Sequence, residues 1–248
     1  MARWDDIAAT LREAITRGDY PPGSVIPRES DLIEEHAVSR ITVRRAIAQL
    51  TAEGLLQPVR RRGTVVRARP PRTRMQRSRQ VYRDEIGYYF DPTAQGWRAL
   101  RPPTIEWGPC PYDIAGLLGI EPGAEVLIRD RIMGDPGTGL APQLATSYLP
   151  ADLSRGTQLA AKDTGPGGIY GRMDDMGHAP LTWYEAISAR MPTPEEAELL
   201  DLAQGVPLLR ILRTTTGSSG RALEVNDTRL DAERFEVGYP ITRDVSAI

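Results

Sequence analysis

The strongest constraint on the fold lies in residues 4–66, where three short helical patterns are separated by turn signals. Apolar residues recur at helical spacing in the first pattern, and Gly18 stands where a left-handed residue ends a helix. A second pattern follows, and a third begins at Ser39, a good N-cap residue, and ends at Gly54. A short helix, a tight turn and a second helix form helix-turn-helix spacing.

A basic hairpin follows the third predicted helix. Residues 55–59 and 64–66 are expected to form two short strands joined by Arg60-Arg61-Arg62-Gly63. Three arginines at a turn have no obvious core role, and they suit contacts with phosphates or insertion into a minor groove. On the third helix, Arg40, Arg44 and Arg45 point away from the apolar stripe. The alternative interpretation is that these arginines form only a solvated face.

The charge of the chain is divided between its halves. Residues 1–80 contain 16 arginines and nine acidic residues, whereas the remainder contains 15 basic and 24 acidic residues, for a net charge of −2. This asymmetry favours a polyanionic partner for the first half. A specific DNA-binding protein and a sequence-tolerant DNA-binding protein both fit this pattern.

Length and composition narrow the class of protein. A chain of 248 residues with 40% hydrophobic residues is expected to form two globular domains. The single cysteine, Cys110, excludes an internal disulfide framework, and no apolar run is long enough to span a bilayer. We therefore expect a soluble protein that is located in the cytoplasm, with no membrane partner.

The first domain resembles the GntR-type winged helix. The resemblance rests on Gly18-Asp19-Tyr20-Pro21-Pro22-Gly23, on Val38-Ser39-Arg40-Ile41-Thr42-Val43-Arg44 and on Arg62-Gly63-Thr64. It implies DNA contacts by Arg40, Thr42 and Arg44, with Gly63 at the minor groove. Arg28 stands where many members have serine, and it is included as a possible substitute contact. The predicted DNA-binding residues are Arg28, Ser39, Arg40, Thr42, Arg44, Arg45, Arg61, Arg62 and Gly63.

An internal repeat with an offset of 82 residues organises the second half. Ala115, Leu117, Leu118, Ile120, Gly123, Leu127 and Arg131 correspond to Ala197, Leu199, Leu200, Leu202, Gly205, Leu209 and Arg213. Each copy predicts a short helix, a turn at glycine and a strand, which gives an α+β domain around an antiparallel sheet. Strand alternation places Arg129 and Arg131 on one face. They are either paired in a buried network, with Glu224 as a partner, or turned toward an anionic ligand.

The second domain resembles the UTRA effector domain of the HutC subfamily, whose fold is similar to that of chorismate lyase. The motifs include Pro122-Gly123, Thr146-Ser147-Tyr148-Leu149-Pro150, Gly168-Ile169-Tyr170 and Glu224. The resemblance implies a small-molecule site, closed by a loop around residues 88–90. Ala145 replaces a glutamate found in many sugar-responsive members, which disfavours a sugar phosphate. The predicted effector-binding residues are Tyr88, Tyr89, Arg129, Arg131, Tyr148, Tyr170 and Glu224.

These patterns predict a winged helix-turn-helix domain over residues 1–67, a linker over residues 68–82 and an effector-binding and dimerisation domain over residues 83–248. The run from Gly87 to Arg98, together with the arginine-rich wing, also resembles actinomycete repressors of conjugative plasmid transfer.

Catalytic motifs are missing from the sequence. The only lysine, Lys162, is followed by Asp163, so no P-loop is present, and two histidines do not assemble a catalytic triad or a zinc site. We expect no catalytic residues, metal or cofactor. The leading hypothesis is a homodimeric repressor that binds double-stranded DNA at an inverted-repeat operator and is released by a small-molecule effector. A chorismate-lyase-like enzyme fused to a DNA-binding domain is the competing hypothesis.

Overall fold

The computed structural model describes the backbone of residues 3–77, 81–83, 89–90, 97–134, 137, 143–241 and 243. The chain divides into two compact units. The first comprises residues 1–71 together with 191–207, and the second comprises residues 72–190 together with 208–248.

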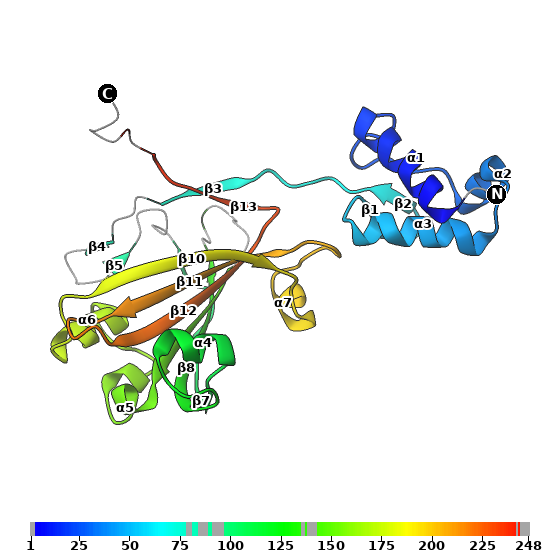
Figure 1. The fold of residues 1–248 in the computed structure, drawn as a ribbon. Coiled ribbons are helices and arrows are strands. Elements are labelled where there is room, and N and C mark those ends of the chain that lie inside the picture. The colour runs from blue at the N-terminus through cyan, green and yellow to red at the C-terminus, as the bar shows by residue number, and fades with distance from the viewer. Residues whose placement is uncertain are drawn as a thin grey trace. The chain divides into compact units, whose positions relative to one another are not determined.

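Three helices and a hairpin form the body of the first unit (Figure 1). Gly18, at φ 89°, ends the first helix in the left-handed conformation, as predicted. Ala37 ends the second helix in the same conformation, and Ser39 caps the third. The elements are α1 (Trp4–Arg17), α2 (Glu29–His36), α3 (Arg40–Ala52), β1 (Leu56–Val59) and β2 (Gly63–Val66).

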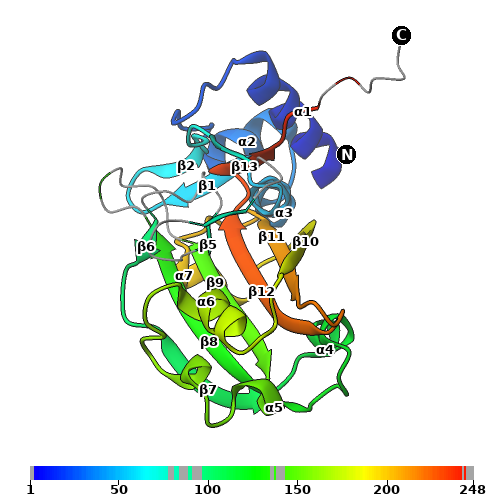
Figure 2. The same ribbon diagram turned by 90° about the vertical axis from the view of Figure 1, so that its left-hand side faces the viewer.

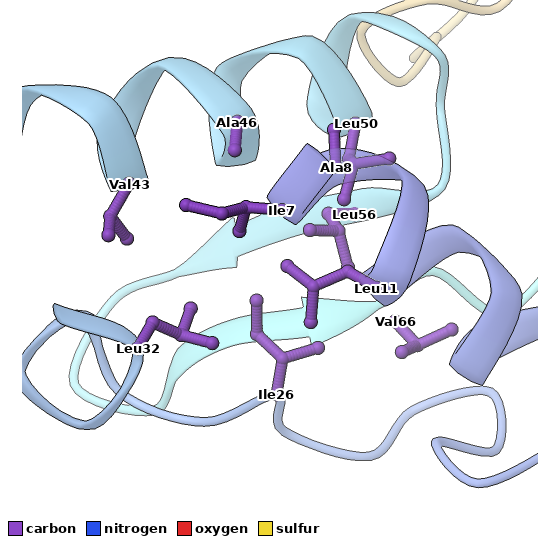
Figure 3. Packing of buried hydrophobic residues seen from close by; sticks show 10 residues of the cluster. All are labelled: Ile7, Ala8, Leu11, Ile26, Leu32, Val43, Ala46, Leu50, Leu56 and Val66. Atoms are coloured by element: carbon purple, nitrogen blue, oxygen red, sulfur yellow. The ribbon is translucent and has the colours of Figure 1, made fainter. Parts of the chain in front are cut away.

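The core of this unit is apolar and continuous. Each of the three helices turns one stripe of side chains inward, and the hairpin closes the core from the remaining side (Figure 3). Burial of these side chains holds the helix-turn-helix in one geometry, because most helical stability in proteins comes from packing of the apolar face. The packed residues are Ile7, Ala8, Leu11, Ile26, Leu32, Val43, Ala46, Leu50, Leu56 and Val66.

The second unit is built on a seven-stranded antiparallel sheet with the strand order β10-β11-β12-β9-β8-β6, in which β7 also pairs with β8 (Figures 1 and 2). This confirms the predicted α+β class with an antiparallel sheet. The strands are β6 (Arg98–Ala99), β7 (Thr104–Pro109), β8 (Glu125–Gly134), β9 (Gln143–Pro150), β10 (Thr182–Arg190), β11 (Leu208–Thr216) and β12 (Ala222–Asp231).

The predicted repeat is visible in the succession of elements. In the first copy, α4 (Tyr112–Leu118) is followed by a turn at Gly123, at φ 78°, and then by β8. In the second copy, α7 (Pro194–Leu199) is followed by a turn at Gly205, at φ 82°, and then by β11. The same order of helix, glycine turn and strand therefore occurs in both segments, as predicted, although α7 belongs to the first compact unit.

The two faces of the sheet have different cores. One face packs Leu127, Leu149 and Leu223 against α5 (Ala151–Ser154), η2 (Gln158–Ala160) and α6 (Gly168–Asp175). Figure 2 shows α6 in front of β8 and β9. The opposite face packs Val126 and Val225 against α4. Strand alternation therefore decides which side chains reach each layer.

The region predicted as a linker is partly a strand. In it, β3 (Thr73–Gln76) pairs in parallel with β13 (Phe235–Gly238), and Met75 is buried against Phe235. This strand was not predicted, because Met75 is the one strongly apolar residue among Thr73–Gln76 and the surrounding sequence is rich in arginine. The remaining strands are β4 (Tyr82–Arg83) and β5 (Tyr89–Phe90). No helix in the described part of the chain is long and apolar enough to cross a membrane.

Candidate functional site

The N-terminus of α3 is capped by Ser39 and carries an exposed arginine. The Ser39 Oγ accepts a hydrogen bond from the Thr42 amide at 3.2 Å and lies 2.9 Å from the Thr42 Oγ1. The cap fixes the first turn, which carries the exposed side chain of Arg40. Because a helix N-terminus bears a partial positive charge, Arg40 adds to an existing attraction for phosphate.

Two further predicted contact residues on α3 have partners within the first unit. The Arg44 Nε donates to the Glu29 carboxylate at 3.0 and 3.1 Å, and the Arg44 side chain remains 65% exposed. The Arg45 guanidinium lies 4.6 Å from the centroid of the Trp4 ring, in cation–π geometry. Arg44 is therefore available at the surface, whereas Arg45 is drawn toward α1.

The hairpin tip presents arginines from a strained turn. Arg61 adopts φ 66° and Gly63 adopts φ 101°, and the first is uncommon for a residue with a side chain. The Arg62 Nη2 donates to the Gly23 carbonyl oxygen at 2.7 Å. Arg60, Arg61 and Arg62 are all exposed. The turn thus projects a compact positive charge beside β1 and β2.

Two residues near α2 and α3 complete this surface. Arg28 is exposed at the N-terminus of α2, where its amide donates to the Asp31 Oδ2 at 3.2 Å. Ile41, which sequence reasoning did not select, is 80% exposed in the first turn of α3. The sequence did contain a signal for this surface role, because Ile41 is an isoleucine outside the apolar stripe of the helix. Such a side chain can contact the methyl group of thymine.

A polar row crosses the sheet of the second unit and forms the floor of a cavity. Glu185, Arg213, Asn226, Ser147 and Arg129 occupy directly paired positions on β10, β11, β12, β9 and β8. All except Ser147 line a cavity of about 750 Å³, and Ser147 is fully buried beneath it. Polar side chains gathered on the floor of a cavity indicate a binding site, since buried polar groups are costly without partners.

Arg129 and Arg131 give this cavity its positive charge. The Arg129 Nη1 donates to the carbonyl oxygens of Leu159 and Ala161, both at 2.7 Å, and the residue is 5% exposed. Burial, with the nearby charge of Arg131, lowers the pKa of Arg129 to about 10. Among the described residues, no carboxylate lies within ion-pair distance of either arginine.

The partner of Arg131 is neutral. The Arg131 Nη2 donates to the Ser147 Oγ at 2.8 Å, and the same oxygen accepts a hydrogen bond from the Asn226 Nδ2 at 3.0 Å. The Arg131 Nε is buried and has no hydrogen-bond acceptor within the described structure. An anion in the cavity could accept a hydrogen bond from the Arg131 Nε.

Glu224 supplies a negative charge on β12, two residues before Asn226 of the row. It is fully buried, its Oε2 accepts from the Thr215 Oγ1 at 2.8 Å, and its Oε1 has no donor among the described groups. Burial raises the pKa of the neighbouring Tyr170 phenol, and the negative charge of Glu224 raises it further. The ring of Tyr170 packs edge-on against Trp183, with centroids 5.6 Å apart. The cavity therefore offers a hydrogen-bond acceptor opposite its donors.

Arg213 and Arg77, which also line the cavity, both form ion pairs with Glu185. The Arg213 Nη2 lies 2.7 Å from the Glu185 Oε1, and the Arg77 Nε lies 3.7 Å from the Glu185 Oε2. Sequence reasoning missed Arg77, Glu185 and Asn226 as cavity residues. Glu185 and Asn226 reach the cavity through strand pairing, and Arg77 follows the end of β3. Arg213 was visible as the repeat equivalent of Arg131.

The structure brings together Arg129, Arg131, Tyr170 and Glu224 of the predicted effector residues. Tyr148 lies elsewhere, because it follows Ser147 on β9 and points to the opposite face, where it packs with the cluster around Cys110. Placing Tyr148 in the cavity was therefore wrong. Tyr88 lies outside the described residues, and the side chain of Tyr89 is likewise not described.

Comparison with known families identifies the class of protein. Residues 4–66 match the family described as bacterial regulatory proteins of the gntR family, and residues 104–236 match the UTRA domain. The chain belongs to the GntR family of transcriptional regulators and carries a UTRA effector-binding domain.

Individual relatives agree with this assignment. An uncharacterized HTH-type transcriptional regulator of Streptomyces coelicolor is 33% identical, over 90% of this chain and 86% of that protein. The histidine utilization repressor of Pseudomonas putida is 29% identical, over 82% of this chain and 77% of that protein. The crystal structure of a putative GntR-family transcriptional regulator superposes with a TM-score of 0.68 at 29% identity, covering 97% of this chain and 98% of that one. The relatives are regulators, in agreement with the expectation that this chain is not an enzyme.

Proposed function

We propose that this chain is a cytoplasmic repressor that binds an inverted-repeat operator as a homodimer and releases it when a small anion occupies the UTRA cavity. The observation that carries the proposal is the pairing of two features in one chain. One is an exposed cationic surface on a helix-turn-helix, and the other is a cavity in which the buried Arg129 lies beside the half-buried Arg131, with no carboxylate of the described structure at ion-pair distance from either.

The DNA-binding part of the proposal rests on the first unit. Arg40, Arg44 and the arginines of the β1–β2 turn are exposed, and Ser39 and Thr42 fix the helix start between them. A recognition helix enters the major groove with its N-terminal residues at the base edges, while a wing contacts phosphates or the minor groove. Arg45 is proposed as a weaker contact, because Trp4 competes for its guanidinium.

The chemistry of the effector follows from the cavity. Arg129 and Arg131 favour a carboxylate or a phosphate, and the Glu224 Oε1 favours a hydroxyl or amino group on the same molecule. Ala145 offers no side-chain acceptor on the floor. A small acid that carries one hydrogen-bond donor therefore fits better than a ligand with many hydroxyl groups.

Release follows from linkage between the two binding reactions. If the bound effector lowers the affinity for DNA by a given factor, bound DNA lowers the affinity for the effector by the same factor. A dimer with two heads needs both half-sites for tight binding, so an effector that favours another arrangement of the heads releases the operator.

The test begins with selection of bound sequences from a random pool of DNA duplexes by the full-length chain. Fluorescence anisotropy then measures binding of the selected duplex at physiological salt with excess bulk DNA. Tight binding to an inverted repeat supports the proposal. Complete displacement by bulk DNA would instead indicate a sequence-tolerant DNA-binding protein.

A further inference from the structure

The sheet of the second unit ends in β10 on one side and, on the other, in β7 and the two-residue β6, which both pair with β8. Edge strands expose backbone groups that can pair with another chain, and proteins usually protect them with proline, charge or covering side chains. The two longer edge strands, β7 and β10, differ in how they are protected.

The β7 edge is protected. Its six residues include the exposed Glu106 and end at Pro109, which cannot donate a backbone hydrogen bond. The Arg155 guanidinium lies 4.5 Å from the centroid of the Trp107 ring and covers it. Each of these features discourages pairing with a further strand.

The β10 edge lacks such protection. Its nine residues, Thr182–Arg190, contain no proline, and β11 is its one pairing partner among the described strands. Four consecutive residues, Ala186, Ile187, Ser188 and Ala189, are exposed, with Ile187 45% exposed and Tyr184 73% exposed. Because neighbouring residues of a strand point to opposite faces, β10 is uncovered on both sides of the sheet here.

The charges of β10 permit pairing with a copy of itself. The strand has one acid, Glu185, and one base, Arg190, both half-buried. An antiparallel pairing centred on Ala186 gives all nine residues a partner. It places Glu185 opposite Ile187 and Arg190 opposite Thr182, so that no like charges face each other.

We propose that β10 is the dimer interface, in which it pairs antiparallel with β10 of a second copy about a two-fold axis at Ala186. The inference rests on the dimer of the proposed function and names its surface. The pairing is isologous and closes after two copies, since each chain offers the same edge to the other. The two sheets become one continuous sheet.

The first experiment is a cysteine cross-link in the full-length chain. Cα atoms directly opposite in an antiparallel pair lie about 4.5–5.5 Å apart, within the range that a disulfide bridges. Ala186→Cys should give a covalent dimer on mild oxidation, seen on a non-reducing gel. The matched control is Thr104→Cys, which places a cysteine at another exposed position, on the β7 edge. The native Cys110 is buried, so it does not compete.

A second pair of variants measures the assembly itself by light scattering. Ala186→Lys should convert a dimer to a monomer, because two ammonium groups would face each other, whereas Thr104→Lys should remain a dimer. A monomeric wild-type chain, an Ala186→Cys variant that does not cross-link, or equal cross-linking by Thr104→Cys would each overturn the proposal. If the wild-type chain is a dimer that binds its operator but Ala186→Cys stays uncross-linked, the interface is elsewhere and the proposed function stands.

Discussion

The Arg44 Nε and the Glu29 carboxylate join α3 to α2 at a distance of 3.0 Å, on the surface proposed to meet DNA. An exposed pair of this kind contributes about 0–1 kcal/mol to stability. It therefore holds Arg44 in place without preventing the guanidinium from reaching a base or a phosphate. Replacing Glu29 with a neutral residue would make this surface more positively charged.

Loss of Arg40 or Arg44 should weaken operator binding and leave the fold intact. Each contact to a base edge is worth about 1–3 kcal/mol, so Arg40→Ala and Arg44→Ala should each weaken binding about fivefold to 150-fold. Arg17→Ala is the matched control, because Arg17 is also exposed but pairs with Asp19 at the end of α1. Anisotropy gives the affinities, and circular dichroism checks the fold. Unchanged affinity in both variants would refute the assignment of α3.

The arginines at the β1–β2 turn should contribute mainly to salt dependence. Each phosphate contact adds about 0.9 to the slope of log affinity against log salt concentration. Arg61→Ala and Arg62→Ala should each lower this slope by about one, with little change in sequence preference. The measurement is a titration of the selected duplex at several salt concentrations. A slope equal to that of the wild-type chain would remove the turn from the interface.

Arg131 should bind the effector without supporting the fold of the first unit. Arg131→Gln should abolish the rise in melting temperature that a small carboxylate or phosphate gives, because ligand binding stabilises the folded state by mass action. Arg155→Gln is the control, since Arg155 is exposed and pairs with Glu125. A thermal-shift screen of small carboxylic acids, phosphorylated metabolites and inorganic phosphate supplies the ligands. An unchanged shift in Arg131→Gln would place the anion elsewhere.

Cys110 should be chemically inert in the native protein. It is 3% exposed, and burial raises the pKa of its thiol, so the reactive thiolate is scarce. A colorimetric thiol reagent at pH 8 should label Cys110 only after unfolding by denaturant. Rapid labelling of the native chain would show that the cluster around α4 opens.

The winged helix-turn-helix of the first unit could be predicted closely from the sequence, whereas the inclusion of residues 191–207 in this unit could not. Its helices end at local signals, such as Gly18 and the Ser39 cap, and its core follows from periodicity within short segments. The strand β3 could not be predicted, because Met75 is buried only by β13, which lies far along the chain. The pattern of residues within a short segment does not show which distant strand will pair with it.

The cavity was predicted only in part, for a related reason. Alternation along β8 placed Arg129 and Arg131 on one face, whereas Glu185 and Asn226 join them through the pairing of β10, β11, β12 and β9. Tyr148 was misplaced by one residue in a strand, which is enough to reverse its face. The resemblance of the loop around Tyr88 to plasmid-transfer repressors stays a prediction.

The most direct test of ligand-controlled repression is the operator affinity of the full-length chain, measured with and without a ligand found in the thermal-shift screen. We expect the ligand to weaken operator binding by the wild-type chain about tenfold or more, within the usual range of coupling energies. The Arg131→Gln variant should bind the operator with the affinity of the wild-type chain, and the ligand should not change that affinity. A ligand that binds the wild-type cavity, raises the melting temperature and leaves operator affinity unchanged would contradict the account.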